Sequence, residues 1–313
     1  MYEANYSEVS QFVLLGLSAS RPVQHFLLFF STVFYVTLFL GNFFVVLAVI
    51  FDPRLHSPMY FFLANLSFID FCLSSATVPK MISNLSSGQK TISFPGCIMQ
   101  IFVLHLMGAS EMGLLITMAF DRYVAICKPL HYLTIMNPRI CILLVAFAWV
   151  VGLIHSVVQL AFVVHLTFCG PNEIDNFYCD LPWFIKLSCM DTYKMEFMVT
   201  ANSGFISIGT FSLLIISYIY ILVTVWKSSP SGLSKALSTL SAHVTVVVLF
   251  FGPCLFIYIW PFPPVPGDKF LSILDYLITP VLNPAIYTLR NKDMKTSMRR
   301  LSSQLLNLRS SSK

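Results

Sequence analysis

Seven long apolar runs decide what this chain can fold into, because each is long enough to cross a lipid bilayer as a helix. One helical crossing needs about 20 residues, and the runs cover residues 24–50, 58–79, 96–127, 140–166, 197–226, 237–261 and 270–289. Backbone groups in lipid must form their hydrogen bonds inside the chain, as a helix does. The sequence therefore predicts an all-α membrane protein, built as a bundle of seven transmembrane helices.

The composition excludes a soluble globular protein. Hydrophobic residues make up 57% of the 313 residues and charged residues only 11%, whereas a soluble domain carries about 25% charged residues. The first 20 residues lack the basic segment and the apolar run of a cleavable signal peptide, so the first helix is expected to act as an uncleaved anchor. Membrane lipid is a predicted partner, and no feature points to nucleic acid.

Three regions follow from the positions of the apolar runs. Residues 1–23 are expected to form a short polar tail, residues 24–290 the seven-helix domain, and residues 291–313 a basic amphipathic helix and tail on the inner membrane surface. With the N-terminus outside the cell, thirteen of the nineteen Lys and Arg residues fall on the cytosolic side, as the positive-inside rule requires. The chain is therefore expected to be a multi-pass plasma-membrane protein with an extracellular N-terminus.

The segments expected outside the cell carry features of an oxidising compartment. Asn5 starts an Asn-Tyr-Ser sequon in the tail, so it is a predicted glycosylation site. The long loop at residues 165–196 is acidic and shows no obvious secondary-structure pattern. Four cysteines fall on this side, where disulfides persist, and they are Cys97, Cys169, Cys179 and Cys189. Four cysteines allow three pairings, and sequence spacing does not choose among them.

Short motifs follow one another in a fixed order along the runs. The third run ends in Asp121-Arg122-Tyr123, an acid and a base at a membrane boundary, which is costly unless they pair or face water. The motifs are Gly41-Asn42, Leu55–Ser67 (LHSPMYFFLANLS), Met118–Tyr132 (MAFDRYVAICKPLHY), Ser217-Tyr218, Lys235–Val244 (KALSTLSAHV) and Pro280–Asn291 (PVLNPAIYTLRN). Together they resemble the odorant receptors, a branch of the rhodopsin-like G-protein-coupled receptors, and the loop length is similar to that of the tetrapod-type (class II) members.

The resemblance implies a function. The chain is expected to be an odorant receptor that binds a small, mostly apolar volatile molecule and activates an olfactory-type stimulatory G protein, raising cyclic AMP in the cilia of olfactory sensory neurons. The resemblance also implies the disulfides Cys97–Cys179 and Cys169–Cys189. A receptor of the same fold that senses a metabolite outside the nose is the alternative, and a transporter or channel is a remote one because the two halves are not repeats.

Neither an enzyme nor a resident cofactor is indicated by the sequence. Ser241 and His243 lie two residues apart, so on a helix they face different ways, and no acid accompanies them. No cluster of metal ligands has the spacing of a catalytic centre. The chain is therefore expected not to be an enzyme.

The resemblance also implies a switch at the cytosolic end. Asp121 is expected to hold Arg122 at rest, and on activation the permanently charged guanidinium moves toward the G protein. The predicted switch residues are Asp121, Arg122, Tyr123, Tyr218, His243 and Tyr287. For His243, which interrupts an apolar run, an ordinary hydrogen-bonded core histidine is the alternative.

Asp70 and Glu111 are the two acids deepest in the apolar runs. Unpaired carboxylates inside a membrane are too costly to persist, and in the helical register of the family these two approach each other. Two arrangements satisfy them: a sodium ion that bridges both and acts as an allosteric modulator, or a hydrogen bond in which they share one proton.

Stripes of residues on four runs form a candidate ligand pocket. In the third run, offsets of 0, 1, 4, 5 and 8 put five residues on one helical face, and Gly108 and Ala109 leave room beside it. Helix–helix packing is the alternative for any such stripe, but odorant receptors commonly use these positions. The predicted lining is Leu104, His105, Gly108, Ala109, Met112, Val199, Asn202, Ser203, Ile206, Phe251, Cys254, Leu255, Tyr258, Tyr276 and Thr279.

This lining predicts the chemistry of the ligand. A mainly apolar pocket suits a small molecule with one or two hydrogen-bonding groups, for which His105, Asn202 and Tyr258 are the expected partners. No acid lies on the outer face of the third run, so a neutral alcohol, ketone, aldehyde, ester or phenol is expected rather than a protonated amine. Asp275 in the seventh run reverses that expectation if its register turns it toward the ligand, and a carboxylic acid requires a protonated His105.

Overall fold

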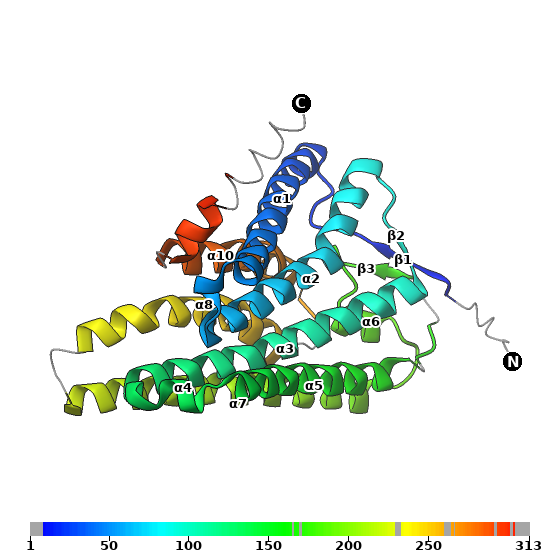
Figure 1. The fold of residues 1–313 in the computed structure, drawn as a ribbon. Coiled ribbons are helices and arrows are strands. Elements are labelled where there is room, and N and C mark those ends of the chain that lie inside the picture. The colour runs from blue at the N-terminus through cyan, green and yellow to red at the C-terminus, as the bar shows by residue number, and fades with distance from the viewer. Residues whose placement is uncertain are drawn as a thin grey trace, which may run out of the picture.

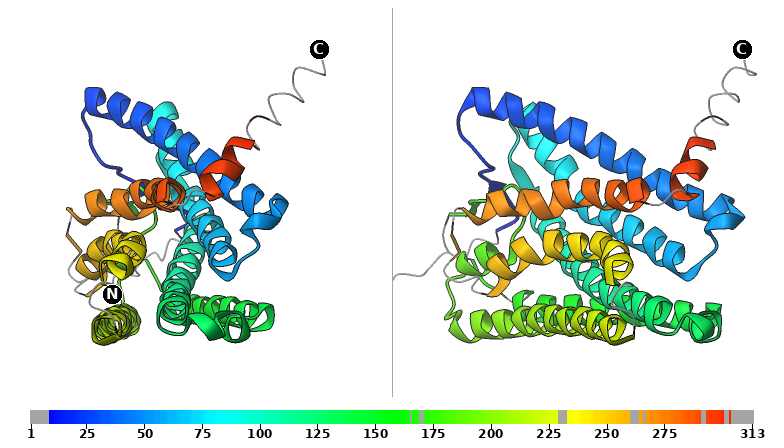
Figure 2. Two further views of the ribbon diagram at one scale, coloured as in Figure 1. Left: turned by 60° about the vertical axis from the view of Figure 1, so that its left-hand side comes forward. Right: turned by 90° about the vertical axis from the view of Figure 1, so that its left-hand side faces the viewer.

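The computed structural model describes residues 9–164, 166–168, 171–228, 233–259, 264–265, 267–290, 293–300 and 303. Within these residues, seven helical segments are long and apolar enough to cross a membrane, which confirms the predicted bundle (Figures 1 and 2). They are α1 (Arg21–Phe51), α2 (Pro58–Ser87), α3 (Phe94–Cys127), α5 (Pro138–Val163), α7 (Tyr193–Ser228), α8 (Leu233–Ile259) and a seventh segment made of α9 (Asp268–Ile273), η4 (Leu274–Ile278) and α10 (Thr279–Arg290).

Two segments differ from what their apolar patterns indicate. The second helix was expected to end near Pro79, but α2 runs on to Ser87 and stops at Gly88. Gly88 adopts a left-handed conformation with φ of 72°, which glycine reaches without steric cost, and its N–H donates to the carbonyl of Asn84. The seventh segment is not a continuous α-helix, because η4 is a single π turn.

A three-stranded sheet covers one end of the bundle, which we call the sheet end (Figure 1). Its central strand β1 (Gln11–Leu14) comes from the N-terminal tail and pairs antiparallel with β2 (Thr91–Ser93) and parallel with β3 (Glu173–Ile174). The short helix α6 (Leu181–Lys186) lies at the same end. The tail and the loop after α5 therefore form regular elements that the sequence pattern does not indicate.

The opposite end carries short connecting helices, and we call it the α4 end after one of them (Figure 1). These connections are η1 (Pro53–Leu55), η2 (Pro129–His131) and α4 (Tyr132–Ile135). Residues 293–300 are also helical, and within them Met294 is fully buried against the core. That contact joins the segment after α10 to the helical bundle.

Buried polar side chains run through a bundle whose outer surface is apolar. Large side chains such as Phe29, Phe147 and Phe205 are exposed on helices, as expected for surfaces that face lipid. Inside, Asn42, Asp70, Glu111 and Asn283 are all at most 1% exposed. The interior thus contains several polar groups, and each of them requires a partner.

Helices α3 and α5 pack closely because glycines lie where they cross. A Cβ atom on Gly152 of α5 would lie 2.1 Å from the Ser110 Oγ and 2.6 Å from the Leu106 carbonyl oxygen, both on α3. A Cβ atom on Gly113 of α3 would lie 2.9 Å from the Cβ of Ala148. Small residues at a helix contact allow backbones to approach within membranes. This contact sets the position of α3.

We expect Gly152→Ala to lower the thermal stability of the protein, because the added methyl group forces α3 and α5 apart. Overpacking of this kind costs about 1–3 kcal/mol. The measurement is the melting temperature of the purified chain in detergent, together with its surface expression in cells. Gly209→Ala on α7 is the matched control, since a Cβ there meets nothing within 4 Å. Equal melting temperatures for the two variants would contradict the role of Gly152.

Candidate functional site

A cavity lies inside the bundle near the sheet end and has a volume of about 690 Å³, open solvent at its mouth included. Residues from α2, α3, α5, α7, α8, η4 and the loop before α6 surround it. They are Leu73, Leu104, His105, Gly108, Ala109, Met112, His155, Tyr178, Cys179, Asp180, Leu181, Ser203, Ile206, Ser207, Phe250, Cys254, Asp275 and Tyr276.

Nine of the residues predicted to line a ligand pocket border this cavity. They are Leu104, His105, Gly108, Ala109, Met112, Ser203, Ile206, Cys254 and Tyr276. Five others do not border it, namely Val199, Asn202, Phe251, Leu255 and Thr279. The side chain of Tyr258 lies outside the described residues. All five predicted positions on α3 border the cavity, whereas those on α7 and α8 do so only in part.

Phe251 illustrates why the α8 positions differ. It is fully buried and packs against Phe211 and Phe250, with ring centroids 5.5 Å and 5.0 Å away. The rotation of α8 about its own axis therefore turns Phe250, rather than Phe251, toward the cavity. Val199 is likewise turned away and joins the apolar cluster of the sheet end.

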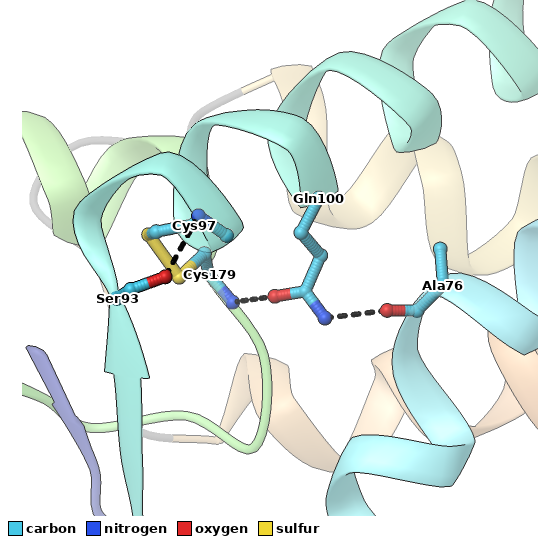
Figure 3. The surroundings of a disulfide bond; sticks show 6 residues. Ala76, Ser93, Cys97, Gln100 and Cys179 are labelled. Carbon is cyan, nitrogen blue, oxygen red and sulfur yellow. Dashed lines mark hydrogen bonds between the residues drawn. A yellow bond between two sulfur atoms is a disulfide. The ribbon is translucent and has the colours of Figure 1, made fainter.

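The roof of the cavity is formed by loop residues 178–180 and by Leu181, the first residue of α6. A disulfide between Cys97 of α3 and Cys179 fixes this loop. Figure 3 shows Gln100 beside the bond: its Nε2 donates to the Ala76 carbonyl on α2 at 2.6 Å, and its Oε1 accepts from the Cys179 N–H at 2.7 Å. The roof is thus joined to both α2 and α3.

Further contacts hold the roof from the side of the seventh segment. The Tyr178 hydroxyl lies 3.0 Å from the Ser272 Oγ on α9, and its ring packs edge-on against Tyr276 at 5.0 Å. The Lys269 Nζ forms an ion pair with Asp175 at 2.6 Å and donates to the Gly16 carbonyl at 3.2 Å. Lys269 therefore joins the seventh segment, the roof loop and the N-terminal tail.

The wall of the cavity contains a pair of histidines. The rings of His105 on α3 and His155 on α5 lie 5.6 Å apart. The His105 Nδ1 lies 2.9 Å from the Ile101 carbonyl oxygen and so acts as a donor, which leaves Nε2 as the acceptor of the neutral ring. Ser203 is also part of the wall, and its Oγ accepts from the Gln159 Nε2 at 2.6 Å, so the hydroxyl hydrogen is available to a ligand.

The deep end of the cavity joins α3, α7, α8 and η4. The Ser207 Oγ lies 4.0 Å from the Met112 sulfur and 3.9 Å from the Cys254 sulfur. Asp275 of η4 lines the same space, and its Oδ1 is buried with no hydrogen-bond partner. The wall and deep end thus offer weak polar groups and one carboxyl in a mainly apolar lining.

Asp70 and Glu111 lie below this cavity and have different surroundings. The Asn283 Nδ2 donates to both oxygens of Asp70, at 3.1 Å and 3.0 Å. Glu111 is 1% exposed, and neither of its oxygens has a partner within the described residues. Glu111 lies within electrostatic range of both Asp70 and Asp275. The expected approach of Asp70 and Glu111 is therefore present.

The Asp121 carboxylate is held on both oxygens. The Arg122 guanidinium donates to Oδ2 from Nη2 at 2.6 Å and from Nε at 3.2 Å, and the Tyr132 hydroxyl donates to Oδ1 at 2.6 Å. Burial, reinforced by Asp121, raises the pKa of Tyr132, so its hydroxyl stays protonated and remains a donor. Tyr132 begins α4, and this bond ties α4 to the end of α3.

The other predicted switch residues lie around the same region. The Tyr218 hydroxyl lies 3.1 Å from the His243 Nδ1. The His243 Nε2 and the Tyr287 hydroxyl are buried and have no partner within the part of the chain that the structure describes. Arg122, His243 and Tyr287 border one small cavity. Tyr123 instead packs against Tyr220, with ring centroids 5.7 Å apart. The structure brings most of the predicted set together, and Tyr123 points to a separate contact.

Several functional candidates lie beyond the reach of the sequence pattern. Asn5 and Cys169 are outside the described residues, so the predicted glycosylation and the Cys169–Cys189 bond stay predictions.

His155 and Asp180 border the cavity, but the sequence pattern does not predict them. The signal for His155 was a lone histidine in an apolar run, and for Asp180 it was an acid next to a cysteine. Both signals are weak because a core histidine and a solvated loop acid are common.

Comparison with known proteins gives a consistent result. A family model described as olfactory receptor matches residues 30–305. The chain is 64% identical over 307 residues to olfactory receptor 4F6 of Homo sapiens, covering 98% of both chains. It is 61% identical over 301 residues to olfactory receptor 4F15 of Homo sapiens, covering 96% of both chains. It is 55% identical over 306 residues to olfactory receptor 4K15 of Homo sapiens, covering 98% of this chain and 94% of the other.

The roof acid Asp180 makes stability depend on pH. Burial raises the pKa of Asp180 to about 7, and the negative charge of Asp268 adds to the rise. In the unfolded chain the group titrates near 3.8, so between these values the folded state holds more protons. Stability therefore falls as pH rises through this window.

We expect Asp180→Asn to remove much of this pH dependence, because an amide does not titrate. The measurement is the melting temperature of the purified chain from pH 5 to pH 8. The melting temperature of the unmodified protein should decline relative to that of the variant as pH rises. Asp191→Asn, at a loop position that is exposed, is the control and should follow the unmodified protein. A constant difference between the unmodified protein and Asp180→Asn at every pH would refute the prediction.

Proposed function

Because the chain belongs to the olfactory receptor family of G-protein-coupled receptors, we propose that its own ligand is a small, mostly apolar volatile molecule bound in the cavity beneath the roof loop. Ligand binding activates an olfactory-type stimulatory G protein and raises cyclic AMP. The observation that carries this proposal is that α3 contributes both to the cavity lining and to the Asp121–Arg122 pair.

The orientation follows from chemistry at the two ends. The sheet end contains the disulfide Cys97–Cys179, which suits an oxidising exterior, while Arg122, Lys128 and Arg139 lie at or near the α4 end, as cytosolic segments require. We place the N-terminus outside the cell. The helical residues 293–300 then lie on the cytosolic side, and the membrane is that of the olfactory cilium.

The mechanism starts from a resting arrangement at the α4 end. Arg122 is bound to Asp121, and the cavity beside it is lined by His243 and Tyr287, each with an unpartnered polar atom. A guanidinium that leaves Asp121 finds hydrogen-bond acceptors there. Movement of α8, which carries His243, widens this cavity and opens the surface for the G protein.

The α4 end also offers an apolar docking point. Leu130 is 94% exposed and Leu133 is 80% exposed, and the groove beside them is formed by residues 127–131, 134 and 135. Exposed large apolar side chains that do not face lipid mark interaction surfaces. The hydrogen bond from Tyr132 to Asp121 links this surface to the Asp121–Arg122 pair. Binding of the G protein at this surface is therefore expected to affect the pair directly.

A sodium ion between Asp70 and Glu111 is the second part of the proposal. The residues fit a cation that prefers oxygen ligands. Both oxygens of Glu111 and the side-chain oxygen of Asn283, whose amide nitrogen binds Asp70, are buried without partners among the described residues. Asp70 and Glu111 would hold the ion, which supplies a positive charge to two otherwise unbalanced acids. The alternative is one proton shared between the two carboxyls.

We expect Arg122→Ala to abolish ligand-evoked cyclic AMP at equal surface expression. Arg122 is the one Lys or Arg within α3, so no other residue of that helix replaces its positive charge. The measurement is a cyclic AMP reporter in cells challenged with volatile alcohols, ketones, esters and amines, followed by nucleotide exchange on purified stimulatory G protein. Arg139→Ala removes an exposed basic residue and is the control. A full response from Arg122→Ala would disprove the switch, and no nucleotide exchange with any ligand would disprove the receptor function.

We expect sodium to stabilise the protein relative to choline at equal ionic strength, because it binds the folded state only. The rise in melting temperature should be on the order of 2 °C and should vanish in Glu111→Gln. Glu173→Gln, at an exposed position of β3, should keep it. Identical melting temperatures in the two salts would favour the shared proton.

A further inference from the structure

Asp275 has an unusual position for an acid in the seventh segment. It lies in η4, a five-residue π turn between α9 and α10. A π turn contains an extra residue, so it rotates the side chains that follow out of the α-helical register, and such turns are frequent at functional sites. Here the neighbours Asp275 and Tyr276 both line the cavity.

One oxygen of the Asp275 carboxyl has no partner among the described residues. This oxygen, Oδ1, is buried with no hydrogen-bond partner, and among the described residues that line the cavity none is Lys or Arg. The acidic neighbour is Glu111, whose oxygens are also unpartnered. A carboxylate enclosed by apolar groups and other acids is strongly disfavoured, so Asp275 either takes up a proton or pairs with a cation. A ligand that carries a positive charge favours the paired form.

The remaining groups of the cavity argue against an anionic ligand. A carboxylate at the deep end would meet a second carboxyl group, that of Asp275, with no Lys or Arg in the described lining to offset it. The only basic side chains in the described lining are His105 and His155, whose rings lie 5.6 Å apart. Protonating both places two positive charges side by side, which disfavours the second proton. The described lining therefore offers no strong partner for an anion.

The rest of the deep lining suits a hydrocarbon. Met112, Phe250 and Cys254 surround the space near Asp275, and Leu104, Ala109 and Ile206 continue it along α3 and α7. A primary ammonium group supplies a positive charge and three donors, and hydrogen bonds between ionised groups are the strong ones. A neutral hydroxyl or carbonyl supplies no charge to Asp275.

We propose that the ligand of this receptor is a small hydrocarbon amine whose ammonium group pairs with Asp275 at the deep end of the cavity. The inference rests on the proposed function for its biological meaning, and it names the chemical class of the ligand. It reverses the expectation of a neutral ligand, because the π turn directs Asp275 into the cavity.

The test uses the full chain in phospholipid nanodiscs and measures ligand-dependent melting temperatures. The ligands are butyl, cyclohexylmethyl and 2-phenylethyl skeletons, each carrying an amine, an alcohol or a carboxylic acid. At least one amine should bind about tenfold more tightly than its matched alcohol, as expected for a charge-assisted hydrogen bond, and the acids should not bind. If no amine stabilises the unmodified protein more than its alcohol does, the inference is wrong, whatever the variants show.

Two variants then locate the amine. Asp275→Asn keeps the shape of the side chain and removes its charge, and it should lose the amine preference while alcohol binding changes less than about threefold. Asp268→Asn removes an acid that lies outside the cavity in the same segment and should keep the preference. If Asp180→Asn abolishes the preference and Asp275→Asn does not, the cation site is at the roof and the assignment to Asp275 is overturned.

Nucleotide exchange on purified stimulatory G protein in the same nanodiscs separates this inference from the receptor function. Exchange driven by alcohols and unaffected by Asp275→Asn would retain the receptor function and overturn the amine site. Amine binding that depends on Asp275 without exchange for any ligand would retain the site and overturn the coupling to this G protein.

Discussion

The contact between the roof loop and α3 supports every other feature of the sheet end. The Cys97–Cys179 bond attaches the loop covalently, and Gln100 fills both hydrogen-bonding needs of its amide with the loop and with α2. The contacts of Tyr178 with Ser272 and of Asp175 with Lys269 add to this anchor and hold the roof from the seventh segment. The central strand β1 depends on this anchor as well, because β3 belongs to the same loop. The loop is therefore joined to α2 and α3 by one small set of bonds, and the tail is joined to the loop through β1 and β3.

Burying acids in an apolar bundle explains where the functional residues lie. Asp121 is satisfied by Arg122 and Tyr132, and Asp70 is satisfied by Asn283. Glu111 and the Oδ1 of Asp275 have no partner within the described residues. An unpaired buried carboxylate is costly. The acids that have protein partners therefore suit a switch in which the bond to the partner breaks on activation. Those without partners suit sites where a cation from outside completes the pairing.

The sequence predicted features that depend on local pattern and missed those that depend on distant contacts. Apolar runs alone define seven helices, and the spacing of Leu104 to Met112 defines one face of α3, which borders the cavity throughout. The rotation of α8 that selects Phe250 over Phe251 depends on its neighbours, so periodicity does not determine it. The π turn at Asp275 and the pairing of β1 with β3 likewise arise from packing between segments far apart in the chain. No local residue pattern encodes them.

Helix α3 connects the two functional ends in a physically specific way. Leu104 borders the cavity and Arg122 the switch, about 27 Å apart along the axis at 1.5 Å per residue. Glycines at Gly113 and Gly152 pack α3 tightly against α5, so α3 is a poor candidate for the moving part. Helix α8 borders both cavities through Cys254 and His243, and it contains Pro253, which removes a backbone hydrogen bond. A ligand that contacts α8 more favourably in one of its positions shifts the protein toward that position. Because α3 stays fixed, the movement of α8 changes the space available to Arg122.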